Sequence, residues 1–290
     1  MAMLKVSIIM NCYNGEQYLK EALESIIKQT YKNWELIFWD NQSTDKSASI
    51  FRSYTDSRFK YYYAPIHTSL GEARKNAIKK TIGKWIAFLD VDDIWLPNKL
   101  SEQIKIINRY KDDNIGLVYG KTYVLEMNGK NKKYFIYRKS DRELLEGHIF
   151  KDLLLKGDFI PFLTAIVNKK AYEEVGGFSS YLKFAPDYYL FILIAEKYIV
   201  KAVKKRIAIY RLHPGNLTKK VSDIAFYEEI RILSSFVNDY PAIQKRITMI
   251  KFRYFLKKRT PPSLFNLFIF IKNYFFRKKK KISHPYYTSS

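Results

Sequence analysis

The stretch WIAFLDVDDIW, residues 85–95, places three carboxylates at the end of an apolar run. Asp90 and Asp92 lie two residues apart, so in extended backbone their side chains point the same way. Carboxylate oxygens suit Mg²⁺ or Mn²⁺, and Mg²⁺ binds through one or two carboxylates together with substrate phosphate oxygens. The stretch therefore predicts a metal site that bridges to a diphosphate. The alternative is that Asp92 and Asp93 begin a turn and cap a helix that opens near Pro97.

Alternating apolar and amphipathic segments must position these acids. Four apolar runs predict strands at residues 6–11, 34–40, 59–63 and 84–90. The segments between them predict helices at 16–29, from about 43 and at 71–82. Strands separated by helices favour a parallel sheet covered on both faces, whose ligands bind beyond the carboxyl ends of the strands. Asn11, Asp40 and Asp90 each end a strand and therefore share this location.

The second half of the chain has a less regular pattern. Residues 114–138 predict two strands joined by a turn at Asn128 and Gly129. Helices are predicted near 141–156 and over 187–198. From about Ser222 the pattern is helical and basic, and it ends in RKKKK at 277–281. We expect the loop at 157–166 to shape the site of the second substrate.

Composition indicates a folded globular protein. Of 290 residues, 47% are hydrophobic, which is ample for a core. The single cysteine, Cys12, excludes an internal disulfide and a cysteine-based zinc site, and it favours a reducing compartment. The amino-terminal apolar run is short and reads as a strand, not as a signal peptide. The apolar stretch 264–276 contains Asn266, Lys272 and Asn273 and is too short to span a bilayer, so we expect no transmembrane segment.

The chain has 51 Lys and Arg against 28 Asp and Glu, a formal net charge of +23. Such a surplus suits nucleic acid, anionic lipid or a phosphorylated substrate. The charge is densest after residue 200, where Phe and Tyr alternate with Lys and Arg, as in helices that lie on anionic membranes. No nucleic-acid motif accompanies it, so no nucleic-acid partner is expected. The basic carboxyl terminus predicts peripheral membrane contact, with a solvated helix face or a tail packed on the domain as alternatives.

Four stretches taken in order resemble the motifs of the family 2 glycosyltransferases, over roughly residues 4–218. They begin at VSIIMN, LGEARKN, GGFSSYL and YRLHPGN, residues 6, 70, 176 and 210. The resemblance implies a GT-A fold, an α/β architecture with a mostly parallel central sheet flanked by helices. It also implies a nucleotide-diphosphate sugar donor, a divalent metal, and transfer with inversion.

The resemblance assigns the nucleotide contacts. Tyr13 would pack near the base, and Asp40 would accept a hydrogen bond from a base N–H, which suits uracil but also serves other bases. Arg74 would help to hold the diphosphate, as a cationic fork does. The alternatives are plain packing for Tyr13, a turn or N-cap for Asp40, and an exposed helix arginine at position 74. The commonest family form has Asn directly after the arginine, whereas this chain has Lys75 and then Asn76.

The resemblance also divides the acids. Asp92 matches the metal ligand and Asp90 a ligand of the ribose or the metal, while Asp93 supports the turn. His213 falls where family members place a histidine near the metal or diphosphate; a structural or solvated role is the alternative.

Asp187 matches the family's catalytic base, which takes the proton of the acceptor hydroxyl as that oxygen attacks the anomeric carbon. It follows a Gly176-Gly177-Phe178 turn and opens an apolar helix. Family members often have an acid just before it, where this chain has Pro186. Asp187 could also be only an N-cap.

Together these features predict a GT-A catalytic domain over residues 1–220, with a nucleotide-sugar half at about 1–95 and an acceptor half at 96–220. A helical, basic extension follows over 221–290. The predicted enzyme is an inverting glycosyltransferase that uses a UDP-sugar and Mn²⁺ or Mg²⁺. Its acceptor is a glycan or lipid-linked glycan, for surface polysaccharide or lipopolysaccharide (O-antigen) synthesis at the cytoplasmic face of a bacterial membrane. The alternatives are a nucleotidyltransferase and a non-catalytic binder of nucleotide sugars or nucleic acid.

Overall fold

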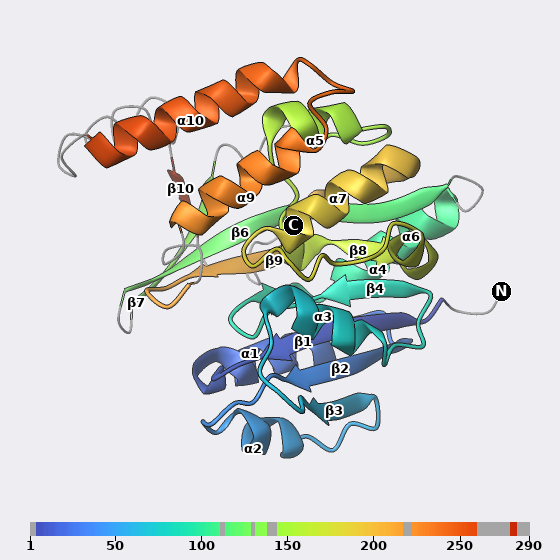
Figure 1. Ribbon diagram of the computed structural model, residues 1–290. Helices are drawn as coiled ribbons and strands as arrows, with labels where there is room; N and C mark the ends of the chain where they lie inside the picture. The colour runs from blue at the N-terminus through green and yellow to red at the C-terminus, as the bar shows by residue number, and fades with distance from the viewer. Residues whose placement is uncertain are drawn as a thin grey trace.

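A mixed β-sheet with helices on both faces forms the body of the protein (Figure 1). The computed structural model describes residues 4–110, 114–128, 131–137, 144–216, 222–259 and 279–282. The strands are β1 (Val6–Cys12), β2 (Trp34–Asp40), β3 (Phe59–Tyr63), β4 (Trp85–Phe88), β5 (Ile94–Trp95), β6 (Ile115–Asn128), β7 (Asn131–Tyr137), β8 (Ile166–Asn168), β9 (Ile199–Leu212) and β10 (Lys279–Ile282). The helices are α1 (Glu16–Ile27), α2 (Ser47–Arg52), α3 (Leu70–Ile78), α4 (Lys99–Arg109), α5 (Phe150–Lys156), the 3-10 helix η2 (Phe162–Thr164), α6 (Lys169–Glu174), α7 (Pro186–Lys197), α9 (Ser222–Ser234) and α10 (Ile243–Arg259).

The strand order is β10-β7-β6-β8-β4-β1-β2-β3, and β9 pairs with β5 and β6. The first four strands β3, β2, β1 and β4 are parallel, as predicted, because a helix connects each to the next. β8 pairs antiparallel with both β4 and β6, and β7 with β6. The expectation of a mostly parallel sheet therefore holds for the first four strands, and the second half is mixed.

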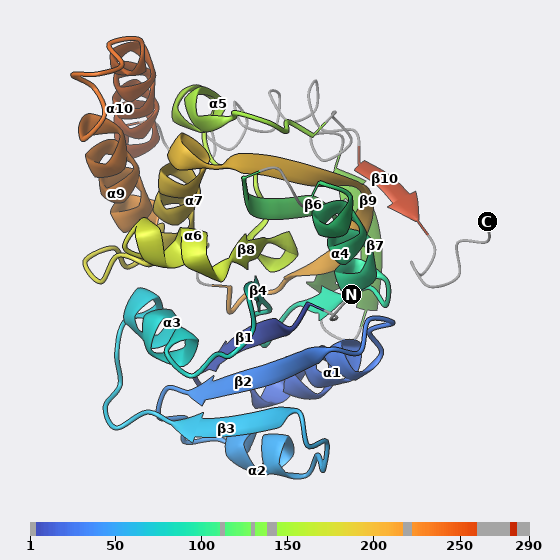
Figure 2. The ribbon, with the colours of Figure 1, turned by 90° about the vertical axis from the view of Figure 1, so that its right-hand side faces the viewer.

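The two faces of the sheet carry separate hydrophobic clusters. On β1, Ile8 and Met10 face the cluster that includes α1, α2 and α4, whereas Ile9 faces the cluster that includes α3, α5 and α7. Figure 2 shows these two groups of helices on opposite faces. Burial on both faces explains why the first strands are nearly continuous apolar runs. Their carboxyl ends leave polar residues at one edge of a rigid sheet.

The predicted helix near 141–156 is shorter in the structure, where α5 begins only at Phe150. Before it, the main chain of Gly147 pairs with Val200 of β9. Gly147 has a positive φ of 93°, a conformation that glycine adopts without strain and that interrupts a helix. Residues 141–143 lie outside the described part of the chain.

The helices α9 and α10 bear out the helical pattern after Ser222, whereas residues 279–282 form β10, antiparallel to β7. Buried residues of α9 and α10, among them Leu233 and Ile243, belong to the same hydrophobic cluster as α5 and α7. The boundary near residue 220 stays a prediction. No helix within the described ranges is long and apolar enough to cross a membrane; the stretch 264–276 lies outside them.

Candidate active site

Asp40 ends β2 next to Cys12, the last residue of β1. It is fully buried, and its Oδ1 accepts a hydrogen bond from the Ser43 N–H (2.7 Å) while its Oδ2 accepts one from the Tyr61 hydroxyl (2.6 Å). Asp40 therefore closes the turn that follows β2, which agrees with the interpretation of Asp40 as a turn residue. A carboxylate has about four acceptor positions, so these two bonds leave capacity for a ligand N–H. Its contact with a base stays a prediction.

Tyr13 follows β1 and is 55% exposed. Its ring meets the His67 ring edge-on, with 4.4 Å between centroids. His67 in turn contacts the main-chain oxygen of Asn41 through Nδ1 (2.9 Å). Tyr13 is thus not buried packing, and it offers an open aromatic surface beside the ends of β1 and β2. Sequence reasoning did not single out His67.

Arg74 lies on α3 and is buried, so the interpretation as an exposed helix arginine is wrong. Its guanidinium lies over the Phe162 ring, with 3.8 Å from Cζ to the centroid. One terminal nitrogen donates to both oxygens of Asp90, at 3.0 and 3.3 Å. Arg74 and Asp90, predicted separately, are therefore a direct ion pair.

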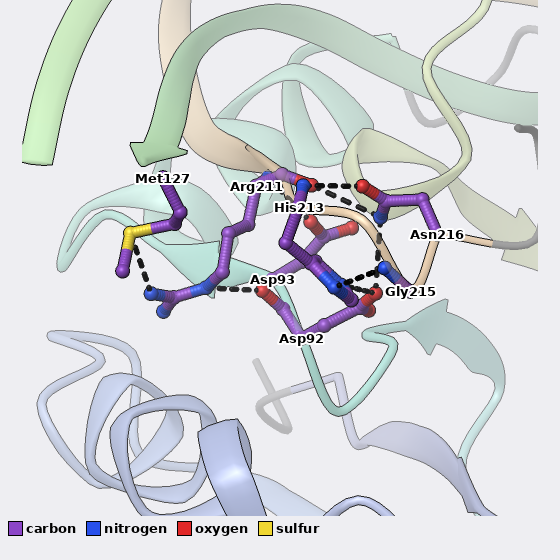
Figure 3. A network of polar contacts seen from close by, with 7 residues as sticks. All are labelled: Asp92, Asp93, Met127, Arg211, His213, Gly215 and Asn216. Carbon is purple, nitrogen blue, oxygen red and sulfur yellow. Dashed lines mark hydrogen bonds and ion pairs between the residues drawn. The ribbon is translucent and has the colours of Figure 1, made fainter. Parts of the chain in front are cut away.

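Asp92 and Asp93 face the end of β9 and the loop that follows it (Figure 3). Asp92 Oδ2 accepts from His213 Nε2 (3.0 Å) and from Asn216 Nδ2 (3.3 Å). His213 Nδ1 accepts from the Gly215 N–H (3.2 Å), so both ring nitrogens have protein partners. In this arrangement His213 orients Asp92, and its role as a direct metal ligand stays a prediction.

Arg211 braces the turn that carries the acids, and it is 1% exposed. Its Nε donates to the main-chain oxygen of Asp92 (2.7 Å), and its main-chain N–H donates to Asp93 Oδ1 (2.9 Å). It also forms an ion pair with Glu21 of α1 and lies over the Tyr18 ring (4.5 Å). Asp93 is buried, which fits its predicted role in the turn. Arg211 stood unassigned in the motif YRLHPGN, although its place two residues before His213 was a usable signal.

Crowding and like charge perturb both acids of this turn. Burial raises the pKa of Asp92, the charge of Asp90 adds to the effect, and the bond from His213 opposes it. Burial together with the charges of Asp92 and Asp90 raises the pKa of Asp93 well above its ordinary value, against the effect of Arg211. A cation at this turn would relieve both the crowding of like charges and the cost of ionising Asp92.

Asp187 is the second residue of α7. The cap residue is Ala185, so the interpretation of Asp187 as the N-cap is wrong. Its Oδ1 accepts a hydrogen bond from the Tyr188 N–H (3.0 Å). The surrounding protein desolvates the carboxylate of Asp187 and so raises its pKa. The charge of Arg74 opposes this rise, and the charge of Asp90 adds to it. Asp187 therefore lies within electrostatic range of the Arg74–Asp90 pair.

Asp158 is a further acid near Asp187, in the loop between α5 and η2. Its Oδ1 accepts from the Ile160 N–H (3.2 Å). Desolvation by the surrounding protein and the charge of Asp187 raise the pKa of Asp158 to about 8, although its side chain keeps an exposed surface. The loop was expected to shape the acceptor site, but Asp158 itself was missed.

Gly71 lets α3 approach the loop that precedes α7. A Cβ at this position would meet the main-chain oxygen of Ser179 at 2.8 Å and Pro186 Cβ at 3.4 Å. Any side chain would therefore push the helix of Arg74 away from the loop that leads to Asp187.

The donor set at Asp92 fits a hard divalent cation. Among the described residues, Asp92 Oδ1 accepts no hydrogen bond, whereas Oδ2 accepts two. No group of three or more His, Cys, Asp or Glu residues in the described ranges could hold a metal ion alone. Mg²⁺ needs only one or two carboxylates when substrate phosphate oxygens and water complete its coordination. Asp92 is the residue that fits, with Asp90 beside it.

The family model described as glycosyl transferase family 2 matches residues 7–176. The chain belongs to glycosyltransferase family 2. It is 33% identical over 198 residues to the Escherichia coli enzyme UDP-Glc:alpha-D-GlcNAc-diphosphoundecaprenol beta-1,3-glucosyltransferase WfgD, a match that covers 68% of this chain and 72% of that enzyme. It is 31% identical over 239 residues to the uncharacterized glycosyltransferase RC0461 of Rickettsia conorii, covering 81% of this chain but 38% of that protein.

Solved structures of other glycosyltransferases share the fold of this family 2 member. S. aureus TarS 1-349 in complex with UDP-GlcNAc matches with a TM-score of 0.69 at 19% identity, covering 90% of this chain and 77% of that one. Mannosyltransferase PcManGT from Pyrobaculum calidifontis, in complex with GDP-Man and Mn2+, matches with a TM-score of 0.61 at 16% identity, covering 87% and 70%. The predicted GT-A fold and glycosyltransferase class are confirmed, and the nucleotidyltransferase and non-catalytic alternatives are set aside.

Proposed function

We propose that this family 2 glycosyltransferase transfers a sugar, with inversion, from a UDP-sugar to a hydroxyl of a lipid-linked glycan in bacterial surface polysaccharide synthesis. One observation carries the proposal: α3 packs through Gly71 against Pro186, the residue before Asp187, and the same helix carries Arg74, which pairs with Asp90. A base for the attacking hydroxyl and a cationic holder for the departing diphosphate are the two groups that direct displacement requires.

In the proposed step, the Asp187 carboxylate accepts the proton of the acceptor hydroxyl. The oxygen forms its bond to the anomeric carbon on the face opposite the diphosphate. The bond from that carbon to the diphosphate oxygen breaks, and its electron pair stays on the diphosphate. Crowding raises the pKa of Asp187, which makes it a stronger base than an exposed carboxylate.

The donor contacts start from Tyr13 and Asp40. Tyr13 and His67 present exposed aromatic surface against which a base can stack, and Asp40 retains acceptor capacity. The E. coli relative is named for UDP-Glc, and TarS was solved with UDP-GlcNAc. We therefore expect a UDP-sugar, with Arg74 on its diphosphate.

Mn²⁺ or Mg²⁺ is the proposed cofactor, held by Asp92 with Asp90 beside it. An ion bound there would neutralise negative charge on the departing diphosphate. His213 and Asn216 fix the carboxylate of Asp92 through Oδ2 and leave Oδ1 for the ion. Outer partners of this kind typically affect metal affinity about 10- to 100-fold.

The acceptor and its location complete the proposal. The E. coli relative is named for a diphosphoundecaprenol-linked GlcNAc acceptor, a lipid. An open groove of about 480 Å³ lies between α9 and α10, lined by Phe226, Tyr227, Ile230, Lys251, Tyr254, Phe255, Lys258 and Arg259. Exposed aromatic rings beside cationic side chains suit the surface of an anionic bilayer. We expect the enzyme to act as a peripheral protein on the cytoplasmic face of the membrane.

Flotation with vesicles of phosphatidylglycerol and phosphatidylcholine tests the membrane contact. The full chain should float with anionic vesicles and lose binding at high salt. Deletion of residues 260–290, which apart from 279–282 lie outside the described ranges, tests the basic tail; replacing Tyr227 and Phe255 by Ser tests the groove. Flotation that none of these changes reduces would contradict the location.

Asp187→Asn tests the catalytic step. Asn keeps the size of the side chain but cannot take up the proton, so kcat should fall about 10²- to 10⁴-fold. The thermal midpoint should stay near that of the wild type. Asp152→Asn, which alters a half-buried acid paired with Lys156 on α5, is the control. Normal turnover by the D187N enzyme would sink the assignment.

The donor is tested by thermal shift with Mn²⁺ and a panel of UDP-, GDP- and dTDP-sugars. A ligand that binds only the folded state raises stability by mass action. We expect the largest shift with a UDP-sugar, and a larger shift with GDP- or dTDP-sugars would overturn the choice of nucleotide.

A further inference from the structure

Glu228 of α9 accepts three hydrogen bonds from consecutive main-chain N–H groups. Its Oε1 accepts from Lys183 (2.6 Å), and its Oε2 accepts from Phe184 (2.8 Å) and Ala185 (2.9 Å). Glu228 is only 8% exposed. A buried carboxylate with three N–H donors forms a strong, charge-assisted anchor. It fixes the main chain over the residues that lead directly to Asp187.

The loop that Glu228 holds has no anchor of its own at this point. Ala185 is the cap residue of α7 and has no polar side chain, and Pro186 has no N–H. Glu228 accepts from the N–H of the cap residue Ala185, the bond that Glu or Gln at the third helix position accepts in a capping box, and it does so from another helix. It lies more than 40 residues away in sequence from each of the three donors.

A second side chain from the C-terminal helices contacts the same helix, α7. Arg246 of α10 is buried, and one terminal nitrogen donates to the Tyr188 hydroxyl (2.9 Å) and to the main-chain oxygen of Leu153 (3.0 Å). Its other terminal nitrogen pairs with Glu229, the residue after Glu228. Tyr188 directly follows Asp187. The segment that contains Asp187 is thus held before that residue by the bonds to Glu228 and after it by the bond between Arg246 and the Tyr188 hydroxyl.

We infer that Glu228 is a positioning residue for catalysis, which fixes the loop 183–185 so that Asp187 meets the acceptor hydroxyl. This inference rests on the proposed role of Asp187 as the base. It makes α9 a working part of the active site, although α9 carries no group that touches a substrate. An error of about 1 Å in the position of a catalytic group can cost roughly 100-fold in rate.

Glu228→Gln tests the inference. Gln presents one acceptor oxygen, and its NH₂ group cannot accept, so at least one of the three N–H groups loses its partner. We expect kcat to fall about 10- to 100-fold, while KM for the nucleotide sugar selected by the thermal-shift panel changes less than about twofold. Glu196→Gln, an exposed acid near the end of α7, should leave both constants unchanged.

The double variant separates positioning from general damage. If Glu228 acts through Asp187, adding E228Q to D187N should not lower the residual turnover further. An equal loss in both backgrounds, or a normal kcat for E228Q, would overturn the inference. If the D187N enzyme is inactive but the E228Q enzyme is fully active, the inference about Glu228 fails while the proposed role of Asp187 as the base still stands. A fully active D187N enzyme removes the proposed base and the inference with it.

Hydrogen exchange keeps the test valid if E228Q folds poorly. In the wild-type protein the amides of residues 183–185 should exchange slowly, at rates near those of the α7 interior, although the Lys183 side chain is exposed. Fast exchange of these three amides in the wild type would overturn the inference. In folded E228Q they should exchange faster, with the interior of α7 unchanged.

Discussion

Asp90 and Asp92 receive their hydrogen bonds from residues inside the family motifs. Arg74 donates to Asp90, and His213 and Asn216 donate to Asp92. Asp187, by contrast, accepts a hydrogen bond from the next residue of its own helix, Tyr188. The loop before it depends on Glu228, which lies beyond the last motif. The proposed metal and diphosphate ligands are therefore held by other motif residues, whereas the loop before the proposed base is held by a residue outside the motifs.

The difference separates two kinds of support. The contacts between motifs hold Asp90 and Asp92, the proposed ligands, so substitutions that remove these contacts should weaken binding of the metal and the donor directly. Contacts from α9 and α10 touch no proposed substrate, so damage to them should affect geometry and stability instead. The C-terminal helices are consequently more than an appendage to the catalytic domain.

Asp92→Asn should have the largest effect of the variants that probe this contrast. Asn keeps the shape but loses the charge that attracts the ion. Loss of an outer partner alone costs about 10- to 100-fold in metal affinity or activity, so loss of the ligand should cost more than about 100-fold in turnover. The stabilisation by UDP with Mn²⁺ should vanish in thermal unfolding. Metal dependence equal to that of the wild type would place the ion elsewhere.

Arg74→Lys should weaken donor binding. Lys keeps the charge but loses the planar fork that pairs with Asp90 and lies over Phe162. A hydrogen bond to a charged group contributes about 1.5–3 kcal/mol, so KM for the UDP-sugar should rise about 10- to 100-fold. Arg58→Lys is the matched control, because Arg58 also pairs with an Asp and lies over a tryptophan ring, near the start of β3. Equal responses of the two variants would argue against a role for Arg74 in the site.

Arg246→Met should test the external bracing through stability. Met retains apolar length but removes the donor to the main-chain oxygen of Leu154 and leaves the carboxylate of Glu229 without its ion-pair partner. We expect the free energy of unfolding to fall by about 2 kcal/mol, measured by chemical denaturation. Lys258→Ala, which removes an exposed ion pair with Asp223 at 2.8 Å, should leave it unchanged. Similar results for the two variants would remove the distinction between buried and exposed bracing.

The pH dependence of kcat should report on Asp187. Crowding raises its pKa above the ordinary value of 3.8. The base works only when ionised, so kcat should fall about tenfold per pH unit below that raised pKa and should level off above it. Because R74K retains the positive charge near Asp187, its acid limb should match that of the wild type. An acid limb at the ordinary value would contradict the crowded environment.

Much of the fold could be predicted from the sequence because β1 to β4 are buried on both faces. Their apolar runs and the intervening helical periods are strong signals. β9 was not predicted as a strand, since Lys204 and Lys205 interrupt it with two consecutive exposed residues. The length predicted for the helix that ends at Lys156 was wrong because the bridge at Gly147 depends on β9. Non-local pairing of this kind leaves little trace in a local pattern.

The candidate site divides in the same way. The resemblance to the family led to Arg74, Asp90, Asp92, His213 and Asp187, and the structure pairs Arg74 with Asp90 and Asp92 with His213. It could not lead to Glu228 and Arg246, which belong to no motif. The partners of Glu228 are main-chain N–H groups, and those of Arg246 include main-chain oxygens; main-chain groups carry no sequence signal. Such residues are found only once the chain is folded.

Gly71 gives the distance between the two sides a simple chemical basis. The absence of one methyl group lets the helix of Arg74 rest on the oxygen of Ser179 and on Pro186. The separation between Arg74, the proposed holder of the diphosphate, and Asp187, the proposed base, is thereby limited only by contact with the main chain. A larger residue at position 71 would push α3 away from Ser179 and Pro186 and so lengthen the distance between Arg74 and Asp187. The missing Cβ of Gly71 thus affects the geometry of the site, although Gly71 is assigned no contact with a substrate.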